Sequence, residues 1–383
     1  MHPSTLILHP TQPTSLDFKA QNIAIYRAST VLFPTAQAFA ARWEEPKPDY
    51  IYGTVGTPTT RALEQLMAAN DGGDGCVLVS SGLAALSLVN LALLKSGDHV
   101  LIADNGYEPN RSMFAHLLGN MGITCASFNP LDLTSLNAAF TPSTKLVWAE
   151  PVGSNTQEVC DLSALAAAVH AHGALLAVDH TWSAGVLINV FKHGADIAIQ
   201  AMTKYQSGHG DVLMGSVVWA DAAVGNQIQQ AREILGYSVS PDDCALMLRG
   251  IQTMHLRLNA QGASTVHIAQ WLATQGAVAQ VLHPALPSAA GHAVWARDYS
   301  GSATLFAFTL KPEYDQEAAY RLINALKLFG IGVSWGGTQS LAMRQVIHRH
   351  VMPRPAGQLI RLHIGLEHVD DLKADLAAGF AAL

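Results

Sequence analysis

The sequence predicts an α/β protein, in which a mostly parallel sheet of seven strands is followed by a smaller α+β domain. Between about residue 58 and residue 220, short apolar or β-branched runs alternate with helical stretches, as in sheets whose strands are joined by helical crossovers. Beyond about residue 225 the pattern becomes helical and then mixes shorter strands with helices. The two domains are expected at residues 55–245 and 246–383.

The elements follow one another in a regular order. The seven strands of the large domain are predicted at Cys76–Val79, His99–Ala103, Ile123–Ser127, Lys145–Ala149, Ala174–Val178, Asp196–Gln200 and Gly215–Trp219. The clearest helices between them are Arg61–Asn70, Leu83–Lys95, Asn110–Met121 and Leu162–His172. The C-terminal domain is expected to contain helices up to Gln275, strands at Ser302–Leu310, Gly330–Trp335 and Gln358–Ile364, and helices at Gln316–Leu328 and Asp370–Ala381.

Residues 1–54 are predicted to form an arm rather than a domain, because this stretch is rich in proline and threonine. Its apolar residues, among them Ile23, Val31 and Phe33, suggest that it packs on something else, such as a partner subunit. Only 13% of the 383 residues are charged, about half of the usual ~25%. Subunit contact therefore explains both the apolar arm and the low charge.

Composition excludes several classes of protein. The best apolar run, Gly82–Leu94, is interrupted by Ser87 and Asn90 and is too short to span a bilayer. No signal peptide is apparent, so a cytoplasmic location and no membrane partner are expected. The formal net charge is −7 without a basic block, so no nucleic-acid partner is expected.

The cysteine and histidine patterns predict no metal site. The four cysteines are far apart and are expected to be reduced. The 17 histidines show no metal-ligand spacing, and His348-Arg349-His350 is expected to be a solvated loop.

Polar residues follow the first and fifth predicted strands, and ligands of such sheets bind at the carboxyl ends of strands. Ser81, Gly82 and Leu83 open a helix, whose free N–H groups could hold a phosphate, or whose serine could be a plain cap. Asp179 could bind a metal, a ribose or a cationic ring nitrogen, or it could cap a loop.

A lysine follows the sixth predicted strand, in Thr203-Lys204-Tyr205. A lysine shielded by apolar neighbours can serve as a Schiff-base nucleophile, whereas a lone lysine is usually a solvated surface group. The phosphate cradle, the acid and Lys204 occur in order on one sheet. Together they fit a cofactor with a phosphate, an aldehyde and a basic ring nitrogen, which is pyridoxal phosphate (PLP).

Two more residues suggest ligand contacts. Tyr107 lies just after a strand and could stack on a planar ring or anchor its own turn. Arg361 lies among apolar residues in a predicted strand, where it could clamp a carboxylate through two N–H groups or form a structural ion pair.

With these motifs in this order, nearly the whole chain resembles the Cys/Met-metabolism family of fold-type-I PLP-dependent enzymes, which have an aspartate-aminotransferase-like fold. Within that family it is most similar to the bacterial cystathionine β-lyases. The matching stretches are Tyr52–Thr57 with Thr59, Ser81–Ala85, Gly97–Val100, Tyr107–Pro109, Asp179–Trp182, Gly194–Asp196, Thr203–Tyr205, Gly208–Asp211, His283–Pro287, Ser334–Gly337 and Leu359–Glu367.

The resemblance implies how the residues would hold the cofactor. Lys204 would bind PLP covalently and, once freed by the substrate, would move the substrate proton. Asp179 would keep the ring nitrogen protonated, and Tyr107 would stack on the ring and is also a candidate base. The Ser81-Gly82-Leu83 backbone and the Thr203 hydroxyl would bind the phosphate.

The resemblance also implies substrate-binding residues and a shared site. Ser334 and Arg361 would surround the substrate carboxylate, and Trp335 matches a tryptophan typical of the β-lyases. Tyr52 would be a catalytic residue contributed by the neighbouring subunit, in contact with both cofactor and substrate. The resemblance suggests that the homo-oligomer is a tetramer.

Four positions depart from the family pattern. Thr54 stands where an arginine often reaches the partner's phosphate, and His180, Ala201 and Gln339 replace the usual Asn, Ser and Glu. None of these changes removes a catalytic group.

The implied reaction is β-elimination of L-cystathionine to homocysteine, pyruvate and ammonia, a step of sulfur amino-acid metabolism in methionine biosynthesis. The first alternative is a γ-active relative, namely a cystathionine γ-synthase or γ-lyase, a methionine γ-lyase or a sulfhydrylase. A broad cysteine-S-conjugate β-lyase and a regulatory PLP-binding protein are further alternatives. A nucleotide-binding α/β enzyme fails because no G-x-G-x-x-G follows the first strand.

Overall fold

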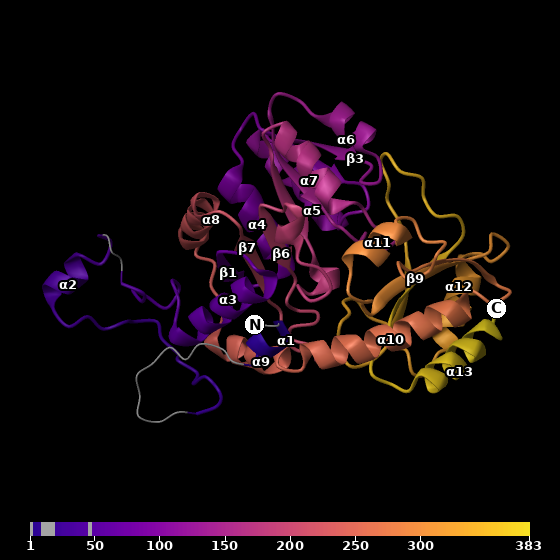
Figure 1. The fold of residues 1–383 in the computed structure, drawn as a ribbon. Coiled ribbons are helices and arrows are strands. Elements are labelled where there is room, and N and C mark those ends of the chain that lie inside the picture. The colour runs from indigo at the N-terminus through magenta and orange to yellow at the C-terminus, as the bar shows by residue number, and fades with distance from the viewer. Residues whose placement is uncertain (1–2, 9–19, 45–47) are drawn as a thin grey trace.

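In the computed structural model, which describes residues 3–8, 20–44 and 48–383, the chain folds around two β-sheets (Figure 1). The larger sheet has seven strands in the order β1-β7-β6-β5-β4-β2-β3. Only β7 runs antiparallel to its neighbours. The strands are β1 (Gly75–Val79), β2 (His99–Ala103), β3 (Thr124–Phe128), β4 (Thr144–Ala149), β5 (Leu175–Asp179), β6 (Ile197–Gln200) and β7 (Gly215–Trp219). All seven predicted strands are confirmed, each end within one residue.

Helices cover both faces of this sheet, which explains why its strands are almost continuously apolar. Alternate strand residues enter two separate cores, for example Leu78 on one face and Val77 on the other. The core containing Leu78 also receives side chains from α3 (Pro58–Asp71), α6 (Leu133–Ala139), α7 (Leu162–Ala171) and α9 (Pro241–Ile251). The core containing Val77 receives them from α4 (Gly82–Leu93), α5 (Glu108–His116) and α8 (Ala222–Leu235).

The helices begin where the sequence places capping side chains. Thr57, Ser81 and Asp161 each accept a hydrogen bond from a backbone N–H in the first turn of α3, α4 and α7. The predicted helix Asn110–Met121 is interrupted, because Leu117 has a non-helical backbone and separates α5 from a short 3-10 helix, η1 (Leu118–Met121). Two further 3-10 turns are η2 (Thr181–Ser183) and η3 (Val190–His193).

The smaller sheet is antiparallel, with strand order β10-β11-β9-β8. Its strands are β8 (Val278–Leu282), β9 (Leu305–Leu310), β10 (Leu341–Gln345) and β11 (Leu359–His363). α10 (Met254–Leu272), α12 (Gln316–Ala325) and α13 (Val369–Phe380) pack in one core with this sheet, and α11 (His292–Asp298) precedes β9. α10 runs along one side of the molecule from the large sheet to the small one (Figure 1).

Part of the prediction for this region is wrong. Gly330–Trp335 is a loop, because Ser334 has a left-handed φ of 76° that does not fit a pleated strand, and only a single bridge joins Gly330 to Leu341. The edge strands β8 and β10 were not expected from the sequence. The predicted domain boundary after residue 245 falls inside α9, and the division at that point stays a prediction.

The predicted arm at residues 1–54 lies partly outside the described residues. Its described part contains only two short helices, α1 (Pro3–Leu6) and α2 (Ala36–Ala40). Ile7 is buried in the core that contains Leu78, and Ile23 packs against the same core, so part of the arm packs on its own chain. The part of the arm around α2 extends away from the body (Figure 1). Leu32 on this extension is 89% exposed and Trp43 is 51% exposed. Among the helices of the described ranges, none has the length and apolar character needed to cross a bilayer.

Candidate active site

Five parallel strands, β1, β2, β4, β5 and β6, end at one edge of the large sheet, and a cavity of about 510 Å³ opens there toward the small sheet. This is the edge at which open α/β sheets bind ligands. Ten of the eleven predicted site residues line the cavity, and Tyr52 does not. The ten are Ser81, Gly82, Leu83, Tyr107, Asp179, Thr203, Lys204, Ser334, Trp335 and Arg361.

Lys204 lies in the turn after β6 and points its amine into this cavity. Its Nζ donates a hydrogen bond to Ser334 Oγ at 2.8 Å and lies 5.5 Å from the centroid of the Trp335 ring. Burial and the nearby Arg361 guanidinium lower the pKa of Lys204 to about 8, although the Asp179 carboxylate opposes this shift. The amine can therefore lose its proton near neutral pH. The interpretation of Lys204 as a solvated surface group does not fit this position.

Asp179 is the last residue of β5, and Thr181, two residues further along the chain, holds its carboxylate. Thr181 donates two hydrogen bonds to Asp179 Oδ1, from N at 3.0 Å and from Oγ1 at 2.6 Å. Burial raises the pKa of Asp179, while the hydrogen bonds from Thr181 and the charges of His180 and Lys204 lower it. The Thr181 hydroxyl also accepts the Ala201 N–H at 2.9 Å, so it joins the loops after β5 and β6. Sequence reasoning missed this role of Thr181, although the residue lies in the matching stretch Asp179–Trp182.

The N-terminus of α4 forms another wall of the cavity. Ser81 is its N-cap and accepts the Ala84 N–H at 3.1 Å, so the capping interpretation is correct and is compatible with an anion above the helix. A Cβ on Gly82 would lie 2.5 Å from the Ala201 Cβ, so only glycine permits this close approach. The Thr203 hydroxyl donates to Met214 O at 3.3 Å and accepts its N–H at 3.1 Å.

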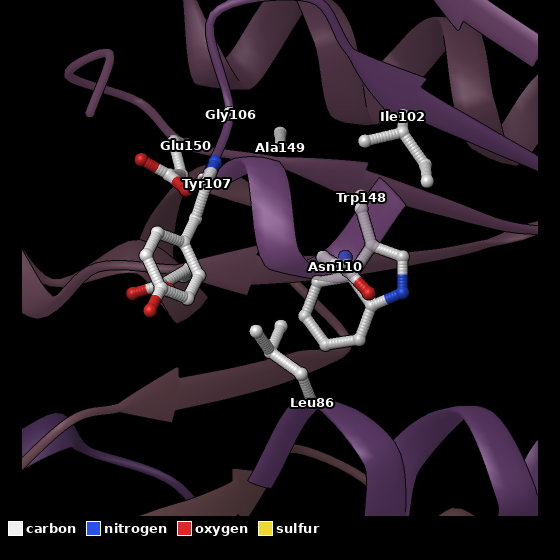
Figure 2. Close-up of a pocket in the computed structure, with 9 residues that line it drawn as sticks. Leu86, Ile102, Gly106, Tyr107, Asn110, Trp148, Ala149 and Glu150 are labelled. Atoms are coloured by element: carbon white, nitrogen blue, oxygen red, sulfur yellow. Dashed lines mark hydrogen bonds between the residues drawn. The ribbon is translucent and has the colours of Figure 1, made fainter. Parts of the chain in front are cut away.

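Tyr107 precedes α5, and its N–H donates to Glu150 Oε1. Figure 2 shows these two residues together at one side of a small pocket, with Trp148 and Leu86 at the other side. Burial and the carboxylates of Asp179 and Glu150 raise the pKa of Tyr107, against a lowering by Arg361. The phenol therefore stays protonated at neutral pH, which favours ring stacking over a role as base. Sequence reasoning missed Glu150, whose pKa burial and Asp179 raise well above its usual range.

Arg361 lies at the centre of β11 and reaches the cavity from the small sheet. Its Nη2 donates to Ser334 O at 3.3 Å and lies 2.8 Å from Met343 Sδ. Burial lowers the pKa of Arg361 to about 10, so the guanidinium remains charged at neutral pH. None of the described carboxylates forms an ion pair with it, so the carboxylate-clamp interpretation is the one the geometry favours.

Tyr52 is the one predicted site residue that lies away from the cavity of its own chain. It is 49% exposed and forms an isolated bridge with Thr30 of the arm. His180, where relatives often have asparagine, is buried and its Nε2 lies 3.1 Å from Asp71 Oδ2.

The donor set fits PLP. The N–H groups at Gly82 and Leu83 suit the phosphate, the Lys204 amine suits the aldehyde, and the Asp179 carboxylate suits a protonated ring nitrogen. The cavity lies within the ~300–1,000 Å³ typical of ligand sites. Among the described residues, no group of three histidine, cysteine or acidic side chains is placed to hold a metal ion.

Comparison with known proteins points to the same cofactor. Residues 4–381 match the sequence pattern of a family described as "Cys/Met metabolism PLP-dependent enzyme". A Rhizobium johnstonii protein, provisionally named a cystathionine β-lyase, is 43% identical over 366 residues, which are 94% of this chain and 91% of that protein. The Escherichia coli cystathionine β-lyase MetC is 39% identical over 373 residues, which are 95% of this chain and 94% of that protein.

A solved structure gives the same fold. The cystathionine γ-synthase of Xanthomonas oryzae, in complex with aminoacrylate and cysteine, superposes with a TM-score of 0.91. It is 29% identical, and the match covers all of this chain and 98% of that one. The likeness confirms the predicted α/β fold of this enzyme family.

Proposed function

This chain belongs to the Cys/Met metabolism family of PLP-dependent enzymes, and from that premise we propose that it is a carbon–sulfur lyase that cleaves L-cystathionine by β-elimination. In this reaction L-cystathionine and water give L-homocysteine, pyruvate and ammonia. The observation that carries the proposal is the cluster of Lys204 Nζ, Ser334 Oγ and the Trp335 ring, opposite Asp179 in one cavity.

Each residue of the cluster has a step for which its chemistry suits it. PLP, when bound, withdraws electrons from the substrate α-carbon. The Arg361 guanidinium binds the α-carboxylate and so aligns the Cα–H bond. The Lys204 amine, with a pKa of about 8, takes the Cα proton. As the Cβ–S bond breaks, its electron pair goes to sulfur, and Lys204 delivers the proton there. The Asp179 carboxylate, held by Thr181, stabilises positive charge on the ring nitrogen.

Two observations favour β- over γ-elimination: Trp335 matches a tryptophan typical of the β-lyases, and the named relatives at 43% and 39% identity carry cystathionine β-lyase names. Trp335 packs edge-on against Tyr205, with ring centroids 5.2 Å apart, and so presents a fixed aromatic wall beside Lys204. γ-Elimination requires a second proton to be removed, from Cβ, by the same groups. The fold does not separate the two reactions, because the cystathionine γ-synthase of Xanthomonas oryzae shares it.

The product formed from L-cystathionine tests the proposal most directly. We expect the purified enzyme to release pyruvate, measured with lactate dehydrogenase and NADH, together with free homocysteine thiol. Release of 2-oxobutyrate instead would reassign the protein to the γ-active group. Turnover of S-alkyl cysteines at a rate equal to that of cystathionine would identify a broader cysteine-S-conjugate lyase.

A lysine pair tests the assignment of Lys204. We expect Lys204→Ala to lose both pyruvate formation and the visible absorbance of the lysine-bound cofactor. Lys192→Ala is the matched control, since Lys192 is exposed in η3, away from the residues that line the cavity, and should keep both. Full activity with unchanged absorbance in Lys204→Ala would overturn the assignment.

We also propose a homo-oligomer in which Tyr52 completes the site of a neighbouring subunit. The exposed arm and the position of Tyr52 outside its own cavity support this arrangement. Mixing Tyr52→Ala with Lys204→Ala should then restore activity, because some sites combine both native residues. No recovery in mixed oligomers would argue against a shared site. Sedimentation equilibrium should give a mass of about 163 kDa for a tetramer, which is four chains of 40.7 kDa.

We place the enzyme in the cytoplasm, as part of sulfur amino-acid metabolism in methionine biosynthesis. Four free cysteines, three of them buried, fit a reducing compartment. Fractionation of cells, with detection of the tagged chain, tests this location.

A further inference from the structure

The segment at residues 346–352, directly after β10, reaches from the small sheet onto the large domain. Gln345, the last residue of β10, and Val346 at the start of the segment line the active-site cavity. The sequence predicted a solvated loop at His348–His350, but the Arg349 side chain is only 2% exposed. The prediction is therefore wrong for Arg349, and its burial needs an explanation.

One end of this segment is held by a single buried carboxylate. Asp104, just after β2, accepts the His350 N–H at Oδ1, at 2.9 Å. Its Oδ2 lies 3.1, 3.0 and 2.7 Å from the N atoms of His350, Val351 and Met352. Arg111 lies 3.6 Å away and balances the charge. Three consecutive N–H groups around one carboxylate fix the path of the backbone there, since hydrogen bonds to charged groups are among the stronger ones.

The buried Arg349 side chain holds the same segment at a second point. Its Nη2 donates to Glu158 Oε1 at 2.7 Å and to Thr156 Oγ1. Glu158 and Thr156 belong to the turn closed by the Val152–Val159 bridge, and Val152 lines the cavity. Both holding points are therefore large-domain elements next to the active site.

The segment is coupled to Arg361 through β10. Met343 pairs with Arg361 in the β10–β11 register, and Met343 Sδ lies 2.8 Å from Arg361 Nη2. Held at residues 349–352, the end of β10 cannot shift along β11 without breaking buried hydrogen bonds. We propose that Asp104 and Arg349 are positioning residues, which set the affinity of Arg361 for the substrate carboxylate by fixing residues 346–352 against the large domain. This rests on the proposed function, in which Arg361 binds that carboxylate.

The chain contains a matched control for Asp104. Asp375 on α13 also accepts backbone N–H groups from three consecutive residues, Lys327, Leu328 and Phe329, and is not among the residues that line the cavity. Asp104→Asn and Asp375→Asn therefore make the same chemical change at a carboxylate that accepts three consecutive backbone N–H groups. Both variants are expected to have a lower Tm.

The two variants are expected to differ in binding. The probe is L-alanine, whose Kd is measured from the change in visible absorbance of the holoenzyme. We expect Asp104→Asn to raise this Kd, and the KM for cystathionine, at least fivefold, with kcat within twofold of wild type. Asp375→Asn should leave Kd and KM within twofold. Hydrogen exchange of the 346–352 amides should accelerate only in Asp104→Asn.

A second comparison separates a positioning role from general loss of stability. In an Arg361→Lys background, Asp104→Asn should raise the Kd of L-alanine by less than twofold, because the group it positions has been replaced. An unchanged Kd in Asp104→Asn, an equal rise in Asp375→Asn, or a full effect in the Arg361→Lys background would each overturn the proposal. If Asp104→Asn does not fold, Glu158→Gln, which weakens the Arg349 contact, is held to the same criteria. Wild type that binds L-alanine but does not turn over cystathionine would refute the proposed function and leave this test intact.

Discussion

The Thr181 hydroxyl allows the charge on Asp179 to be weakened without touching the carboxylate itself. Replacing Thr181 by valine keeps the shape of the side chain and removes two hydrogen bonds, the 2.6 Å bond to Asp179 Oδ1 and the 2.9 Å bond from Ala201 N. The backbone N–H of residue 181 still reaches Oδ1 at 3.0 Å, so the carboxylate keeps one of its two partners.

The magnitude follows from the type of bond. A hydrogen bond to a charged group contributes about 1.5–3 kcal/mol, and one pKa unit corresponds to about 1.36 kcal/mol. Loss of the Thr181 hydroxyl should therefore raise the pKa of Asp179, adding to the rise that burial already causes. If the carboxylate charge is needed fully in the transition state, kcat falls by about 10–150-fold. The Ala201 N–H left without an acceptor should lower stability by about 1–3 kcal/mol.

The assay is the pH dependence of pyruvate release, with Tm measured in parallel. Because the role proposed for Asp179 requires the anion, activity should be lost as pH falls through its pKa, so a raised pKa moves the acid limb of the profile to higher pH. Thr144→Val is the control, since the Thr144 hydroxyl also accepts a backbone N–H and contacts the titratable His99, but at the amino end of β4. A Thr181→Val enzyme that loses Tm like the control, but keeps kcat within twofold and an unshifted acid limb, would refute the reasoning.

Three further changes have defined outcomes. Gly82→Ala places a methyl group 2.5 Å from Ala201 Cβ and should weaken PLP retention on dialysis at least tenfold, whereas a retained cofactor would argue against close packing at this helix end. Ser334→Gly should have a free energy of unfolding about 1 kcal/mol higher than that of Ser334→Ala, measured by denaturant titration. Both variants lose the same hydroxyl, but only glycine relieves the φ of 76°. In the cofactor-free enzyme, PLP capture should speed up as pH rises through about 8, since burial favours neutral Lys204; a midpoint near 10.5 would contradict this.

The large sheet and half of the site could be predicted because short stretches of sequence are enough to identify them. Each buried strand is an unbroken apolar run, and a polar or glycine residue follows it directly, as with Ser81 after β1 and Asp179 at the end of β5. Parallel strands bring their carboxyl ends to one edge, so residues about 100 positions apart meet without any long-range information beyond the topology. Lys204 is found by the same rule.

The rest depends on contacts between the two sheets, which no local pattern records. Arg361 and Ser334 reach the cavity only because the small sheet docks over the large one. The place of Arg361 among apolar residues left a carboxylate clamp and a structural ion pair both open, and Ser334 was assigned from the family resemblance alone. Gly330–Trp335 was predicted as a strand from its apolar residues, but the left-handed Ser334, which places its hydroxyl on Lys204, excludes a ladder. Thr181 was missed because in the sequence it resembles a helix-capping residue. Asp104 was missed because it resembles an ordinary acidic residue of a loop.

The exposed Tyr52 and the low content of charged residues both suggest that part of the surface of a single chain is covered by another subunit. Two apolar residues at the cavity, Val333 and Leu213, are 81% and 69% exposed, and the arm adds Leu32 and Trp43. Exposed apolar side chains of this size are unfavourable in water, and where they gather in one patch they mark an interaction surface. Since Tyr52 lies on the same arm and outside its own cavity, a neighbouring copy would cover this surface and complete the site in one contact. We therefore expect dilution below the dissociation constant of the oligomer to reduce activity in step with the loss of assembly, and activity that survives in isolated monomers would contradict a shared site.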